Sequence, residues 1–163
     1  MKCCDVGFIG LAGSGKDTAA MALIAHGWRR MAFADHLKEL ARSFGWDGVK
    51  DDKGRKLLQD LGMAARTYNP NFWINKAYCG LNAVNRNFSK IPRVWTDVRF
   101  QNEVDFVRGR GGLIIRIQRP DQESRDSHES ETNQFGIHAD YNVKNDGTIE
   151  ELHDKILAIL QHD

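Results

Sequence analysis

The sequence has almost no net charge, few cysteines and no long hydrophobic run. Lys and Arg number 23 against 22 Asp and Glu, so bulk electrostatics gives no reason to expect nucleic acid or a membrane as a partner. No apolar stretch is long enough to span a bilayer, and the N-terminus has no hydrophobic core of a secretory signal. The three cysteines are an odd set without a metal-binding spacing, which is typical of reduced thiols. We therefore expect a single cytoplasmic domain of 163 residues.

Zinc-binding and stacking patterns are missing as well. The spacings between four histidines match no zinc-binding signature: His128, His138, His153 and His162. The four tryptophans are scattered and are expected in the core. Trp73, beside Phe72, is the one that could instead stack on a base.

A glycine-rich stretch from Gly10 to Thr18 is the most informative part of the chain. It follows an apolar run at residues 6–9 and opens into a helix-favouring run at residues 19–24. Glycines at such a turn allow several backbone N–H groups to point at one anion, and the following helix adds its positive dipole end. Lys16 can reach the outer phosphates of a nucleotide. The pattern predicts a phosphate-binding loop.

The residue after Lys16 departs from the usual pattern. Ser or Thr is expected there, but the sequence has Asp17, and Thr18 comes one position later. Asp17 could hold Mg²⁺ directly or through water, while Thr18 could donate to an inner phosphate.

Strand and helix patterns alternate along the chain. They predict an α/β fold of three layers, with a mostly parallel five-stranded sheet and helices on both faces. The expected strands are Val6–Ile9, Trp28–Phe33, Val94–Val98, Leu113–Ile117 and Tyr141–Lys144. The polar, charged segment at about 119–134 cannot bury itself and is predicted to be a mobile lid.

Polar residues near the ends of these strands are expected to converge, because ligands of parallel sheets bind at the carboxyl edge. Asp97 could orient Mg²⁺ or its water, and Arg99 could clamp a phosphate. The alternatives are a helix cap for Asp97 and a surface ion pair for Arg99. Asp35 could cap a helix, accept from a substrate hydroxyl, or do both.

Further arginines allow two interpretations. Arg55 and Arg66 share a predicted helix with Gln59, and from spacing alone they are surface residues. Arg116 and Arg119 flank the polar segment, where they could close over phosphates or belong to a solvated loop.

The ordered set of motifs is similar to the bacteriophage deoxynucleoside monophosphate kinases. The motifs are GLAGSGKDTAA, AFADHLKEL, GRKLLQDLG, NFW, TDVRFQNE, IRIQRP, HESE and NDGTIEEL. The resemblance covers nearly the whole chain. It implies a single P-loop kinase domain over residues 1–163, with a helical monophosphate-binding insertion at about 36–90 and a lid at about 119–134. It also implies ATP and Mg²⁺ as cofactors, a deoxynucleoside 5′-monophosphate as substrate, and the host cytoplasm as location if a phage encodes the protein.

The resemblance also implies residue roles. Lys16, Asp35 and Arg99 would form the catalytic set. The donor ATP would contact Gly13, Ser14, Gly15, Lys16, Asp17, Thr18, Arg116, Arg119, Asn145 and Gly147, the last two near the adenine. The substrate pocket would contain Asp35, Lys38, Arg55, Gln59, Arg66, Trp73, Asp97 and Arg99. Mg²⁺ would lie near Asp17 and Asp97. His36 replaces a proline of the family's A-D-P-L-K run, which affects only the rigidity of that turn.

Three other functions remain to be compared. Dephospho-CoA kinase shares the P-loop, the second-strand aspartate and the C-terminal asparagine turn, although this chain is short for it. A regulatory protein that only binds or hydrolyses ATP would not need a second set of phosphate-binding arginines. A DNA-binding accessory protein is disfavoured by the near-zero net charge. A homodimer is open, since an apolar edge strand or helix could pair two subunits.

Overall fold

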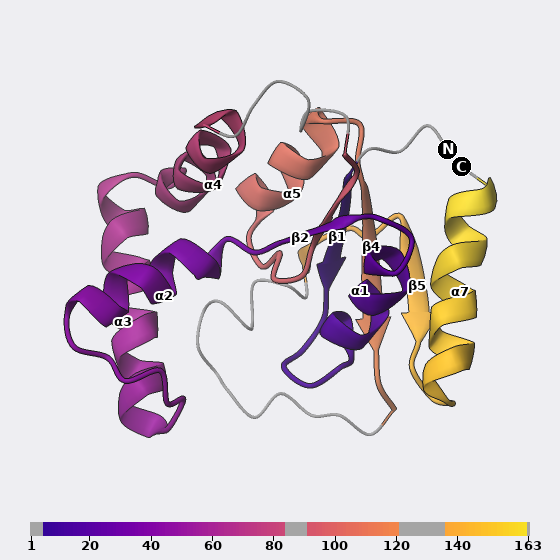
Figure 1. Ribbon diagram of the computed structural model, residues 1–163, viewed down its shortest axis with the longest axis horizontal. Helices are drawn as coiled ribbons and strands as arrows, with labels where there is room; N and C mark the ends of the chain where they lie inside the picture. Colours follow the sequence, from indigo (N-terminus) through magenta and orange to yellow (C-terminus); the bar gives the residue numbers. More distant parts are fainter. Residues whose placement is uncertain (1–4, 84–90, 121–135, 163) are drawn as a thin grey trace. The chain divides into compact units, whose positions relative to one another are not determined.

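Strand β1 (Asp5–Ile9) is the central strand of the sheet and is buried along its whole length. The computed structural model describes residues 5–83, 91–120 and 136–162 (Figure 1). β1 pairs in parallel with β3 (Arg93–Trp95) on one side and with β4 (Leu113–Gln118) on the other. β2 (Arg29–Met31) and β5 (Tyr141–Lys144) form the edges, which gives the order β2-β3-β1-β4-β5. The predicted five-stranded α/β sheet is confirmed, and all its pairings are parallel.

Helices cover both faces of this sheet. Val6 and Phe8 point to the face covered by α1 (Lys16–Ile24) and α7 (Ile149–His162), where they join one apolar cluster. Gly7, between them, faces the other side, because successive strand residues alternate. There a Cβ on Gly7 would lie 2.8 Å from Ile114 Cδ1 and 3.6 Å from Val107 Cγ1 of α5 (Gln101–Gly109). The absence of a side chain at Gly7 therefore lets the helix pack closely on the sheet.

The chain divides into two compact units. The sheet unit comprises residues 1–31 and 90–163, and the helical unit comprises residues 32–89. The helical unit contains α2 (Ala34–Ser43), α3 (Asp52–Tyr68) and α4 (Phe72–Ala83). No helix in the described ranges is long and apolar enough to cross a membrane.

The start of α3 is folded against the loop that precedes it. Asp51 caps the helix, because its Oδ1 accepts from the N–H of Gly54 at 2.7 Å. A Cβ on Gly54 would lie only 2.1 Å from the carbonyl oxygen of Val49, so the missing side chain allows this close approach. The indole N–H of Trp46 donates to the same oxygen at 2.9 Å. These contacts fix the loop on the first turn of α3.

The spacing of apolar residues predicts that two aromatic side chains lie on the inner faces of their helices, but neither is buried. Phe44, at the end of α2, and Tyr68, at the end of α3, are both exposed. Trp46 is buried in place of Phe44, because the chain turns back and the N–H of Trp46 donates to the carbonyl of Ala41. Both errors fall at helix ends, where the helical period no longer determines which side chains point inward.

A buried ionic cluster lies at the amino end of β1, at the end of the strand opposite the glycine loop. Asp5 is fully buried. Its carboxylate accepts from Arg93 at 3.4 Å, from the indole N–H of Trp95 at 3.1 Å and from Arg110 at 2.8 Å. The cluster joins β1, β3 and the end of α5. Because the cluster is buried and lies at the opposite end of β1 from the glycine loop, we infer that it stabilises the fold rather than takes part in binding.

Candidate active site

The glycine loop connects β1 to α1 and has a left-handed backbone at three of its glycines. Gly10, Gly13 and Gly15 have φ angles of +140°, +83° and +102°, which side-chain-bearing residues rarely adopt. At Gly10 a Cβ would also lie 2.3 Å from the carbonyl oxygen of Ile117 on β4. The loop therefore wraps closely around the end of β1 and delivers the chain to the N-terminus of α1. This is the strand–loop–helix context that the sequence predicted.

A cavity of about 400 Å³ lies over the glycine loop, within the sheet unit. Its lining residues come from the loop, α1, the end of β4 and the turn before α7: Gly13, Gly15, Lys16, Asp17, Thr18, Arg119, Asn145, Gly147 and Ile149. Eight of the nine were predicted from the sequence to contact the donor nucleotide. Segments as far apart as residues 13 and 147 are thus brought together. The size and the mixture of cationic, carboxylate and small residues suit a ligand with several anionic groups.

Ile149 lines the cavity but was not predicted to be a site residue. The apolar spacing at residues 149, 152, 156, 159 and 160 predicts that Ile149 lies on the buried side of the last helix, whereas it is 58% exposed. The reason is its position as the first residue of the helix, next to the turn that forms the cavity wall. An exposed isoleucine in a binding cavity offers an apolar surface on which a flat ring can rest. The turn signal before it, Asn145–Gly147, was the clue in the sequence.

The ammonium group of Lys16 is held by its own loop. It donates to the carbonyl oxygen of Gly10 at 2.5 Å and to that of Leu11 at 2.7 Å. The N–H of Ser14 also donates to the Leu11 carbonyl, at 3.1 Å. Asp17 is exposed in the first turn of α1, with its carboxylate available to solvent. One cation, Lys16, and one carboxylate, Asp17, therefore line the cavity at the N-terminus of α1.

Several hydrogen bonds hold the turn between β5 and α7 in place. The side-chain amide of Asn145 donates to the carbonyl of Ser14 at 2.9 Å, and its backbone N–H donates to Gln118 at 2.7 Å. Lys155 donates to the Lys144 carbonyl and to Asp146, and its bond and charge lower the pKa of the Asp146 carboxyl.

The helix that follows this turn begins with a capping box. The N–H of Thr148 donates to the Glu151 carboxylate at 2.9 Å, and the N–H of Glu151 donates to the Thr148 hydroxyl at 3.2 Å. The Thr-x-x-Glu spacing of residues 148–151 predicts such a box, and the structure confirms it. The start of α7, and with it this wall of the cavity, is therefore fixed.

Asp97 and Arg99 lie in the connection between β3 and α5. The strand ends at Trp95, two residues before Asp97, so both residues belong to the loop rather than to the strand. A buried carboxylate orders this loop: Glu103, 1% exposed, accepts from the N–H of Arg99 at 2.8 Å and from that of Phe100 at 3.2 Å. Glu103 was not among the functional residues predicted from the sequence. Its position three residues after the helix cap is the spacing of a capping box and could have revealed it.

Replacing Glu103 by alanine should lower the free energy of unfolding by about 1–3 kcal/mol, because an acceptor shared by two backbone N–H groups is lost from a buried place. Glu103→Gln keeps one carbonyl oxygen and should be milder. Chemical denaturation measures both, with the exposed Glu39→Ala on α2 as the control. Equal effects of Glu103→Ala and Glu39→Ala would refute this role.

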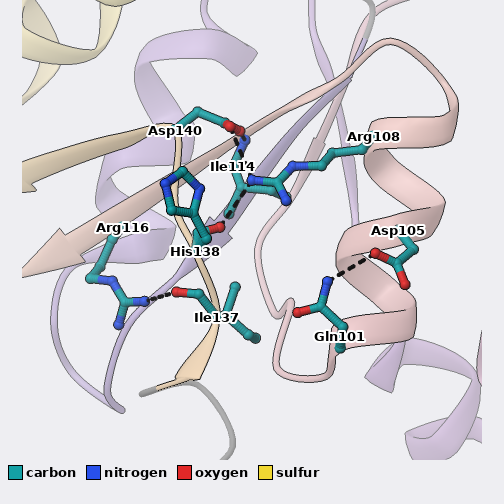
Figure 2. A network of polar contacts seen from close by, with 8 residues as sticks. All are labelled: Gln101, Asp105, Arg108, Ile114, Arg116, Ile137, His138 and Asp140. Atoms are coloured by element: carbon teal, nitrogen blue, oxygen red, sulfur yellow. Dashed lines mark hydrogen bonds and ion pairs between the residues drawn. The ribbon is translucent and has the colours of Figure 1, made fainter.

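Arg116 is placed away from the cavity lining. Its guanidinium donates to the carbonyl oxygen of Ile137, and burial lowers its pKa from the ordinary value (Figure 2). Nearby, Arg108 of α5 donates to the carbonyl of His138 and to Asp140, both at 3.0 Å. Asp140 in turn accepts from the N–H of Ile114 at 2.7 Å. The two arginines therefore fasten the segment that leads into β5.

The candidate substrate residues of the helical unit fall on α2 and α3, except Trp73, which lies on α4. On α2, Lys38 pairs with Asp35 at 3.3 Å. On α3, Arg55 is exposed and its Nε donates to the carbonyl of Lys50 at 3.1 Å. Gln59 comes four residues after Arg55 and Arg66 eleven residues after it, so the three share one face of the helix.

Trp73 does not have the surroundings that base stacking requires. It is 2% exposed, and its indole N–H donates to the carbonyl of Gly62 at 3.1 Å. An indole with both faces covered cannot accept a base, so the stacking hypothesis is corrected to a core role. The expected lid, at about 119–134, lies outside the described residues except for its first two.

The sequence is similar to those of known proteins. A family model described as deoxynucleotide monophosphate kinase matches residues 53–156. A protein of Acanthamoeba polyphaga mimivirus, provisionally named deoxynucleotide monophosphate kinase, is 32% identical over 96% of each chain. The deoxynucleotide monophosphate kinase of Enterobacteria phage T4 is 30% identical over 110 residues, which are 66% of this chain and 45% of the phage protein.

Solved structures agree on the fold. Dephospho-CoA kinase from Campylobacter jejuni superposes with a TM-score of 0.52 at 15% identity, over 96% of this chain and 95% of that one. TT1252 from Thermus thermophilus superposes with a TM-score of 0.55 at 19% identity, over 99% and 98%. At such identities the likeness concerns the fold alone. The glycine loop, the parallel sheet and the sequence matches lead to one conclusion: this chain belongs to the deoxynucleotide monophosphate kinase family.

Proposed function

We propose that this protein transfers the γ-phosphoryl group of ATP to a deoxynucleoside 5′-monophosphate, giving a deoxynucleoside diphosphate and ADP. Such a reaction supplies precursors for DNA synthesis. The observation that carries the proposal is the cavity over the glycine loop, in which Lys16, Asp17 and Arg119 meet the turn at residues 145–149. Membership of the kinase family supports it independently.

The residues around the loop fit a nucleoside triphosphate. The left-handed glycines let backbone amides face an anion, and Lys16 and Arg119 add two cations. The β5–α7 turn, with Gly147 and the exposed Ile149, offers a place for the base. Mg²⁺ prefers one or two carboxylates together with phosphate oxygens, so Asp17, with Asp97 as the second candidate, would hold it. When bound, Mg²⁺ neutralises charge on the phosphates.

The chain's own residues then need to position and neutralise rather than to react covalently. Phosphoryl transfer develops negative charge on the transferring group, and Lys16 and Arg119 would balance it. Arg99 and Asp35 would face the acceptor monophosphate. Lys38, Arg55, Gln59 and Arg66 would complete its pocket. The attacking phosphate oxygen is already anionic, so a general base is not needed.

The proposal is tested by offering acceptors one at a time. ADP release from ATP and Mg²⁺ is measured with dAMP, dGMP, dCMP, dTMP or dephospho-CoA. We expect release that depends on one or more deoxynucleoside monophosphates, which would also define the base specificity. Release with dephospho-CoA alone would assign the protein to the structurally similar kinase. ATP binding without release for any acceptor would refute the kinase reaction.

A further inference from the structure

Asn145 joins two parts of the site that lie far apart in the sequence. Its side-chain Nδ2 donates to the carbonyl oxygen of Ser14 at 2.9 Å, across 131 residues of chain. Its own backbone is anchored by the bond to Gln118, and Lys155 holds the neighbouring Lys144 and Asp146. The amide is therefore presented to the glycine loop from a fixed support.

Ser14 depends on this contact for its orientation. Its side chain is 1% exposed, and its hydroxyl has no hydrogen-bond partner among the described residues. The backbone provides what holds the residue: the N–H donates to Leu11 and the carbonyl accepts from Asn145. The hydroxyl thus contributes nothing to fixing the Ser14–Gly15 peptide.

The next residue, Gly15, leaves room for the asparagine. A Cβ on Gly15 would lie 2.4 Å from Asn145 Nδ2, and the φ angle of +102° also excludes ordinary residues. In a planar trans peptide the carbonyl and the following N–H point in opposite directions. Holding the Ser14 carbonyl toward Asn145 therefore turns the Gly15 N–H away from it. That N–H precedes the first turn of α1, where amides have no partner within the helix.

We propose that Asn145 is a positioning residue for the phosphate-binding loop: its amide fixes the Ser14–Gly15 peptide so that the loop amides are oriented for the donor's phosphates. This inference rests on the proposed binding of ATP and extends it. It assigns Asn145 to the phosphates, whereas the family resemblance implied a place near the adenine. A residue that acts on the loop affects ligands with phosphates, and a residue that contacts the base affects ligands with a base.

Two probes separate these roles. Inorganic triphosphate with Mg²⁺ carries the phosphates alone, and adenosine carries the base alone. Their affinities are measured by competition with a fluorescent ATP analogue. For Asn145→Ala we expect about tenfold weaker triphosphate binding, the effect of one lost hydrogen bond, and adenosine binding within about twofold of the wild type. Asn142→Ala, at an exposed position of β5, is the matched control and should change neither.

The isosteric Asn145→Asp variant repeats the test with the volume unchanged, and it serves if the alanine variant does not fold. It also places a carboxylate beside the Ser14 carbonyl, so its triphosphate affinity should fall further. Unchanged triphosphate affinity in both variants would overturn the proposal, as would a loss of adenosine affinity. Failure of the wild-type protein to bind triphosphate would overturn it too. A lack of acceptor-dependent ADP release would refute the kinase reaction and leave this binding test valid.

Discussion

Lys16→Met should reduce phosphoryl transfer by about 10²–10³-fold and leave the melting temperature unchanged. The lysine is the cation of the glycine loop, and its ammonium already lies against the carbonyls of Gly10 and Leu11. Methionine keeps the length and apolar stem of the side chain, so the loop loses a charge without gaining a void. Preorganised cations of this kind lower transition-state energy by several kcal/mol, because the surroundings exclude water.

The measurement is ADP release at saturating acceptor, together with thermal unfolding. The control is Lys56→Met on α3, whose ammonium forms an exposed pair with Asp60 and should be dispensable. A folded Lys16→Met protein with wild-type turnover would contradict both the role of Lys16 and the proposed reaction.

Asp5→Asn should lower the free energy of unfolding by about 3–5 kcal/mol, the usual effect of breaking a buried ion pair on one side. The carboxylate is fully buried and accepts from two guanidinium groups and an indole. The amide of asparagine would keep one acceptor and present a donor to the remaining cations. Arg93, whose side chain is itself buried, would then lose the carboxylate to which it donates.

Urea denaturation measures this loss. The comparison variant is Asp60→Asn, which breaks the exposed pair with Lys56 and should change stability by less than about 1 kcal/mol. Because the cluster lies at the amino end of β1, Asp5→Asn should retain its affinity for ATP wherever it is folded. Similar losses for Asp5→Asn and Asp60→Asn would show that the buried cluster contributes no more than a surface pair.

Local sequence patterns correctly predicted those features of the structure that local interactions determine. The strand–glycine–helix run placed the loop, and the Thr148–Glu151 spacing placed the start of the last helix. The alternation of strands and helices predicted the parallel sheet, since parallel strands need long crossover connections, which are usually helices. Of the nine cavity residues, the glycine-loop pattern predicted Gly13 and the four residues from Gly15 to Thr18, whereas Asn145 and Gly147 were implied only by the family resemblance.

What the sequence could not show depends on long-range packing. Trp73 fits a helix face equally well whether it meets a base or, as it does, the Gly62 carbonyl. Arg116 lies near the carboxyl end of β4, where a phosphate-binding residue could lie, and its guanidinium donates to the carbonyl of Ile137. The contact from Asn145 to Ser14 joins residues 131 positions apart, and no local period can indicate it. In each case the sequence shows which side chain is present, but the tertiary structure determines which group it contacts.

The parallel strand order has a consequence for how the chain is made. β1 and its glycine loop are synthesised early, but their neighbours β3 and β4 lie about ninety and more residues later in the chain. The asparagine that holds the loop follows later still. A nascent chain thus carries the complete glycine motif long before it carries a site, and closing such distant pairings slows folding. The cavity is therefore complete only when the turn between β5 and α7, which lines it, has been synthesised.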